Sequence, residues 1–76
     1  MERALTDVTT VTVTLNGKEW EVPPGLTVEG LLEHLDLNPS LVVVELNREI
    51  LDRAAFGEVP IRAGDVLELV HFVGGG

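Results

Sequence analysis

The residues with the clearest chemical potential are the last three of the sequence, Gly74, Gly75 and Gly76, which follow a strand-like run at 66–73. Glycine has no Cβ, so a segment of three glycines adds no side chain to a core. It offers an α-carboxylate at the end of a narrow, extended backbone segment without side chains, which could enter a narrow slot in another protein. If the tail is functional, Gly76 carries the carboxylate and Gly74 and Gly75 are the residues that pass through the slot. The competing interpretation is an inert, frayed terminus.

The other side chains offer little catalytic chemistry. The chain has no cysteine and no glycine-rich phosphate loop, and His34 and His71 have no metal-type partner at close spacing. Glu19 and Glu21 occupy alternate positions of a predicted strand, so both would lie on its solvent-facing side. That placement accounts for the pair of carboxylates without a catalytic role. A chain of 76 residues also has little room for a pocket of the usual size, roughly a few hundred Å³. We do not expect this chain to be an enzyme.

Length and charge predict one acidic domain. With 76 residues, 45% of them hydrophobic, the chain can supply a single continuous core. Thirteen acidic against five basic residues give a formal charge of −8. That balance argues against binding to nucleic acid or an anionic membrane, and favours a partner with a positive docking face. With no membrane-length apolar run and no signal-peptide pattern near the start, we expect a cytoplasmic protein that is monomeric when free.

The first part of the chain predicts a β-hairpin. Valine and threonine alternate over 8–15, which is typical of a half-buried strand. Asn16-Gly17 follows, and this pair favours a type I′ turn because both central positions need positive φ. The return strand is expected at 18–22, with Trp20 and Val22 on its inner face.

An amphipathic helix should come next. Thr27 stands at the position of a helix N-cap. The helix should end near Asp36, because Asn38-Pro39 disfavours helical backbone. Apolar residues recur at helical spacing on one stripe, namely Val28, Leu31, Leu32 and Leu35.

Three further strands are predicted at 41–46, 49–51 and 66–73, the first of them an apolar run typical of a central strand. One helical turn is expected around 54–56, with Phe56 and Ile61 closing one end of the core. The connection through the helix, about eighteen residues, is long enough for the first and last strands to pair in parallel.

This order predicts an α+β protein of the β-grasp type, in which a mixed sheet of four to five strands wraps one helix. The whole chain, 1–76, is expected to form this single domain. Residues 1–7 are expected to be a flexible leader, and 74–76 a flexible, functional tail.

The last strand also predicts a docking surface. If Leu67 and Leu69 point into the core, strand alternation sends Glu68, Val70 and Phe72 to the opposite face. One helix covers only one side of a sheet, so this face would stay exposed. We name Val43, Glu68, Val70 and Phe72 the outer patch, and a contiguous apolar patch is typical of a partner site. The alternatives are reversed alternation or a loop that covers this face.

From Val8 onward the chain resembles the ThiS family of ubiquitin-like sulfur carriers in thiamin biosynthesis. The similarity rests on short stretches in a set order and spacing. These are Leu15-Asn16-Gly17-Lys18, Thr27-Val28 with Leu31-Leu32 and Leu35, Leu46-Asn47-Arg48-Glu49-Ile50, Ala63-Gly64-Asp65-Val66-Leu67 and Val73-Gly74-Gly75-Gly76. The chain departs from the family pattern in its leader and in the bulky Trp20.

The resemblance implies a mechanism and a set of partners. A ThiF-like adenylyltransferase would use ATP to adenylate the Gly76 carboxylate. A persulfide supplied through a cysteine desulfurase would displace AMP and leave a thiocarboxylate, whose sulfur a thiazole synthase would accept. The chain itself would bind no cofactor, because the activating partner holds the ATP.

Two other interpretations remain open. One is a related carrier with a different acceptor: the small subunit of molybdopterin synthase, a tRNA-thiolation carrier or a protein-conjugating carrier. Self-conjugation would be limited to Lys18, the only lysine, or to the N-terminus. The other is a β-grasp interaction module whose glycine tail is inert.

Overall fold

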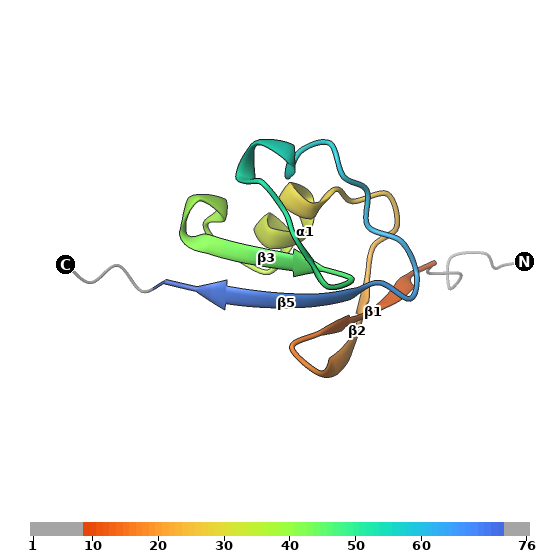
Figure 1. Ribbon diagram of the computed structural model, residues 1–76. Coiled ribbons are helices and arrows are strands. Elements are labelled where there is room, and N and C mark those ends of the chain that lie inside the picture. The colour runs from red at the N-terminus through yellow and green to blue at the C-terminus, as the bar shows by residue number, and fades with distance from the viewer. Residues whose placement is uncertain (1–8, 73–76) are drawn as a thin grey trace, which may run out of the picture.

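The computed structural model describes residues 9–72 and shows a five-stranded mixed sheet with one α-helix on one side (Figure 1). The strand order is β2-β1-β5-β3-β4. The β-grasp prediction is confirmed, including the parallel pairing of the first and last strands. The predicted leader at 1–7 and the tail at 74–76 lie outside the described residues. The elements are β1 (Val11–Leu15), β2 (Lys18–Val22), α1 (Val28–His34), η2 (Pro39–Leu41), β3 (Val42–Leu46), β4 (Glu49–Ile50), η3 (Arg53–Ala55) and β5 (Val66–His71).

The hairpin of β1 and β2 forms as predicted. Asn16 and Gly17 both have positive φ, 51° and 85°, as a type I′ turn requires. Val22 is completely buried, whereas Trp20, on the same face of β2, is 46% exposed. Trp20 lies on the edge strand of the sheet, next to the hairpin turn, where α1 does not cover it fully. Its face was predicted correctly, but its neighbours leave much of the ring in solvent.

Helix α1 begins and ends at the predicted signals. The Thr27 Oγ1 accepts a hydrogen bond from the Gly30 N–H at 3.1 Å, which caps the first turn. After the C-cap at Leu35, Asp36 adopts a φ of 64°, which ends the helix. Three residues of its apolar stripe, Val28, Leu31 and Leu32, are fully buried. Across residues 9–72, every helix is too short to cross a membrane.

The core lies between α1 and the sheet, and β5 is the central strand. β5 pairs in parallel with β1 and antiparallel with β3, so the apolar run at 42–46 lies one place from the sheet edge instead of at its centre. Phe56 and Ile61 are 3% and 5% exposed and close one end of the core, as predicted. The short helical turn just before them is η3.

Candidate functional site

The outer patch is exposed, as the alternation along β5 predicts. Leu67 points into the core and is fully buried, whereas Val70 and Phe72 are each 53% exposed. Glu68 is exposed as well, and Val66 on the same face is 45% exposed. No described segment covers these side chains. The sheet therefore presents apolar side chains to solvent on the side opposite α1.

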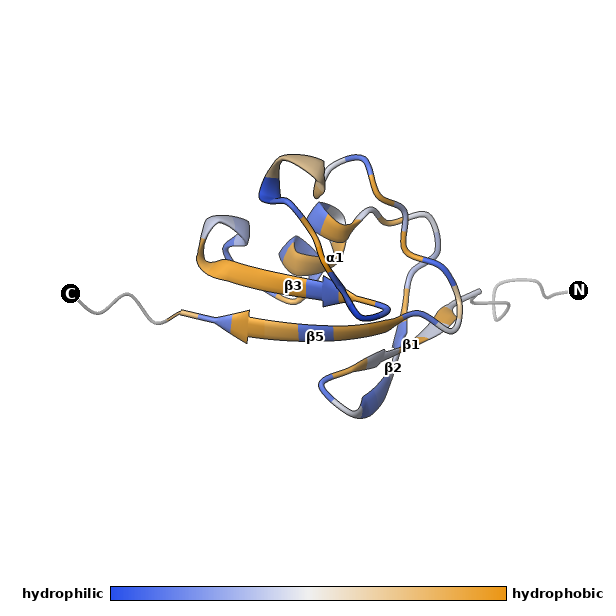
Figure 2. Ribbon diagram, in the orientation of Figure 1, coloured by the Kyte–Doolittle hydropathy of each residue, from blue (hydrophilic) through white to orange (hydrophobic). Residues whose placement is uncertain are grey.

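Strand pairing makes the outer patch contiguous. Val43 of β3 lies directly opposite Val70 of β5, and its side chain is half-buried. Beyond the end of β5, the Phe72 N–H donates to the Leu41 carbonyl at 2.8 Å, which keeps the backbone at Phe72 beside the start of β3. Both strands are predominantly orange in the hydropathy colouring, with hydrophilic breaks (Figure 2). The patch is therefore built from two neighbouring strands, not from one exposed residue.

The outer face of the sheet is also acidic. Glu45 and Glu68 lie opposite each other on β3 and β5, and Glu19 and Glu21 face the threonines of β1 across the hairpin. The strand positions on this face include no lysine or arginine. The outer face of the sheet therefore carries both apolar side chains and carboxylates.

Two asparagine side chains hold β5 in place. The Asn16 Oδ1 accepts from the Leu69 N–H at 2.7 Å, and the Asn16 Nδ2 donates to the Leu69 carbonyl at 3.1 Å. At the start of β5, the Asn47 Oδ1 accepts from the Val66 N–H at 2.9 Å. The Asn47 Nδ2 donates to the Asp65 carboxylate at 3.1 Å.

The Asn16 bonds extend the sheet beyond the reach of β1. β1 pairs with β5 only through Thr14–Val66 and Leu15–Leu67, because the chain then turns into β2. The side-chain amide of Asn16 supplies the next pair of hydrogen bonds to β5, which a further residue of β1 would otherwise supply from its backbone. Sequence reasoning assigned Asn16 only its turn conformation and missed this contact, whose partner lies 53 positions away.

The predicted reactive and threading residues, Gly76, Gly75 and Gly74, lie outside the described residues. β5 leads to them, with Val73 as the intervening residue after Phe72. Within residues 9–72, no group of three or more histidine, cysteine or acidic side chains is placed to hold a metal ion. His34 on α1 and His71 on β5 remain without an assigned chemical role.

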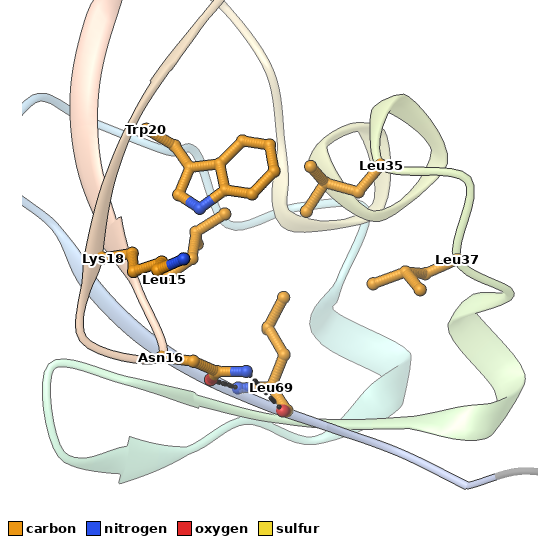
Figure 3. Close-up of a pocket in the computed structure, with 7 residues that line it drawn as sticks. All are labelled: Leu15, Asn16, Lys18, Trp20, Leu35, Leu37 and Leu69. Carbon is orange, nitrogen blue, oxygen red and sulfur yellow. Dashed lines mark hydrogen bonds between the residues drawn. The ribbon is translucent and has the colours of Figure 1, made fainter.

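The expectation that the chain has little room for a pocket is wrong. A groove of about 380 Å³ opens between the hairpin and the end of α1. Trp20 faces Leu35 across it, and Leu69 points into the space between them (Figure 3). The groove exists because α1 ends at His34 and leaves Trp20 incompletely covered. The bulky Trp20, the single tryptophan of the chain, was the only feature of the sequence that pointed to this groove. We call this site the Trp20 groove, lined by Leu15, Asn16, Lys18, Trp20, Leu35, Leu37 and Leu69.

Comparison with known proteins identifies close relatives along nearly the whole chain. The sequence model of the ThiS family matches residues 8–76. The sulfur carrier protein ThiS of Bacillus subtilis is 44% identical over 64 residues, which cover 82% of this chain and 96% of the relative. The crystal structure of the thiamine biosynthesis protein ThiS from Geobacter metallireducens has a TM-score of 0.74 and 39% identity, and the match covers 87% of this chain and 100% of that one.

A second kind of relative is much longer. The thiazole synthase of Magnetococcus marinus is 42% identical over 62 residues, which are 82% of this chain but only 19% of that protein. This chain therefore spans about a fifth of the thiazole synthases that it matches. The family match, the near-complete coverage of the short relatives and the shared fold lead to one conclusion: the chain belongs to the ThiS family.

Proposed function

We propose that this protein is a sulfur carrier for thiazole formation in thiamin biosynthesis. The observation that supports this most directly is the family match, which runs through the glycine tail to Gly76 and includes a relative named as a sulfur carrier. The likeness to a segment of thiazole synthases supports an enzyme of that kind as the sulfur acceptor.

In the first step, the Gly76 carboxylate attacks the α-phosphorus of ATP in a ThiF-like adenylyltransferase. A carboxylate–phosphorus bond forms and pyrophosphate leaves, which gives an acyl-adenylate at Gly76. The step is needed because a carboxylate oxygen is a poor leaving group, whereas AMP is a good one. This chain supplies the nucleophile, and the partner supplies ATP and its catalytic residues.

In the second step, the terminal sulfur of a protein persulfide, produced through a cysteine desulfurase, attacks the acyl carbon and AMP leaves. The product is an acyl disulfide. A second thiol then attacks the sulfur of the persulfide protein, so the S–S bond breaks and a thiocarboxylate remains on Gly76. That thiol is oxidised to a disulfide as the bond is reduced. The thiocarboxylate sulfur then passes to the thiazole synthase.

Docking is the role proposed for the outer patch. Its exposed Val70 and Phe72 lie next to the sequence that carries the tail. A partner that binds the outer patch would fix the position from which the glycine tail enters its active site. The carboxylates on this face would meet a basic partner surface and speed encounter between the two proteins.

Intact mass is the decisive test. The protein is incubated with ATP, a ThiF-like adenylyltransferase and a persulfide source with a reducing thiol. We expect a mass gain equal to the exchange of one oxygen for one sulfur, mapped to Gly76. The gain should disappear when Gly76 is deleted. A folded protein that shows neither an adenylate nor a thiocarboxylate with several such enzymes would contradict the proposal.

Gly75→Val tests the threading role of the tail. A β-branched side chain is wider than glycine and stiff at χ1, so it should obstruct the slot that admits the tail. We expect the rate of adenylation to fall by roughly tenfold or more, which corresponds to about 1.4 kcal/mol in the barrier. Pyrophosphate release under single-turnover conditions measures the rate, and an unchanged rate would exclude a narrow slot at Gly75.

A further inference from the structure

The Trp20 groove lies on the side of β5 opposite the outer patch and takes no part in the proposed carrier chemistry. Its volume, about 380 Å³, is within the range typical of small-molecule sites, roughly 300–1,000 Å³. Apolar side chains converge on it from β1, β2, β5 and the end of α1. Trp20 is 46% exposed, so a ligand that covered the indole ring would remove a large apolar surface from water.

The polar groups of the groove are mainly hydrogen-bond donors. The Lys18 ammonium lines it and, like the Trp20 indole N–H, it donates no hydrogen bond to another residue within 9–72. An ammonium and an indole offer donors only. The Asn16 amide is engaged with the Leu69 backbone through both its oxygen and its nitrogen. Of the seven residues that line the groove, Lys18 is the only charged one, so the groove combines apolar walls with a single cationic side chain.

We propose that the Trp20 groove binds a small aromatic carboxylate, that is, a flat apolar ring system that carries one carboxylate group. The ring lies against Trp20 and the leucines, and the carboxylate accepts hydrogen bonds from Lys18 and the indole N–H. The inference is independent of the carrier reaction, because the groove contains none of the tail and none of the outer patch.

The net charge of the protein makes this proposal sharply testable. At −8, the molecule as a whole repels anions and attracts cations. A preference for the anionic member of a matched set of ligands therefore has to come from a local cationic site. Three probes share one ring and differ in charge: 2-naphthoate, 2-naphthalenemethanol and 2-naphthylmethylammonium.

The experiment is a titration of the full chain with each probe, followed by NMR of the leucine methyl groups and the Trp20 indole N–H. We expect 2-naphthoate to bind most tightly and the ammonium probe most weakly, with shifts at Leu35, Leu37 and Leu69. Lys18→Met should weaken 2-naphthoate by roughly two- to fivefold, the range for one exposed ion pair. It should leave the neutral alcohol unchanged.

Arg62→Met is the matched control, because it removes the same charge from an exposed loop position outside the groove. It should bind 2-naphthoate as the unmodified protein does. Trp20→Ala, with its fold verified by circular dichroism, should lose binding of both the anion and the alcohol. Equal losses in the Lys18 and Arg62 variants would show that only overall charge matters and would overturn the proposal.

Other occupants give distinct results, and each would overturn the proposal. If a second copy of the chain fills the groove, the Trp20 signal shifts on dilution without any probe. If residues 1–8 fill it, their deletion shifts the same signals. Probe shifts at Val70 and Phe72 instead of the groove leucines, or no shifts up to the solubility limit, would also exclude this site.

Discussion

The two faces of β5 carry apolar residues for different reasons. On the inner face, Leu67 is fully buried between α1 and the sheet, and its burial stabilises the fold. On the outer face, Val70 and Phe72 are as apolar but 53% exposed, so they contribute little to the stability of this chain alone. Exposed apolar residues on an uncovered sheet face are the feature on which the proposed docking role rests.

These two faces show that hydropathy alone does not separate a buried face of a strand from an exposed one. Both faces of β5 are predominantly apolar over six residues, as in a strand buried on two sides. The number of covering layers makes the distinction, since α1 is the one α-helix within residues 9–72. A substitution on the inner face should therefore change stability, and one on the outer face should change partner binding.

Leu67→Ala should produce the largest effect on stability. Leu67 lies opposite Leu15 of β1 and Leu46 of β3, so its removal leaves a cavity at the centre of the sheet. Truncation of a fully buried leucine lowers the free energy of unfolding by about 2–5 kcal/mol. Urea denaturation measures the change.

Val66→Ala is the matched control, one residue away on the outer face and 45% exposed. It should cost less than about 1 kcal/mol, the span of strand propensities. If the two alanine variants lose similar stability, the assignment of an inner and an outer face to β5 is wrong.

Phe72→Asp should leave the fold intact and weaken docking. With Phe72 half-exposed, the free energy of unfolding should change by about 0.5 kcal/mol or less. A carboxylate in the centre of an apolar contact should raise the KM of the adenylyltransferase for this protein by about tenfold or more, as for an interface hot spot.

Thr12→Asp controls for charge in the same assay. Thr12 is exposed on the outer face of β1, away from the outer patch, and gains the same negative charge. Its KM should stay within about twofold of the unmodified protein, since exposed charge pairs contribute only about 0.2–1 kcal/mol. Equal effects of the two variants would mean that net charge, not the patch, directs docking.

Much of this architecture is readable from local signals. Thr27 capped the helix, Asn16-Gly17 turned the hairpin, and alternation along β5 placed Leu67 inside and Phe72 outside, as predicted. Each signal acts within a few residues, so the chain itself carries the information. The identity of the outer patch followed because one helix covers only one face.

The features that sequence reasoning missed depend on contacts between distant segments. The Trp20 groove exists because α1 ends where it does relative to β2, and no local pattern sets that relation. The side-chain amide of Asn16 makes hydrogen bonds to Leu69, which lies 53 positions away in the sequence. The Asn16-Gly17 pair predicted the turn but could not predict this second role. In both cases the residue was noticed, but its partner was set by the tertiary fold.

Asn16→Gly tests whether the Asn16 amide fixes the strand that carries both faces. Glycine keeps the positive φ of the turn, so the substitution removes only the side-chain bonds to Leu69. Losing these exposed hydrogen bonds should lower the free energy of unfolding by about 1 kcal/mol. Hydrogen exchange at the Leu69 amide should become faster, while the Leu67 region, still paired with β1 and β3, should keep its protection relative to global unfolding. The second half of β5, which orients Val70 and Phe72, would then loosen without the first half. A uniform change along β5 would show that the Asn16 amide adds nothing beyond the backbone ladder to the placement of the outer patch.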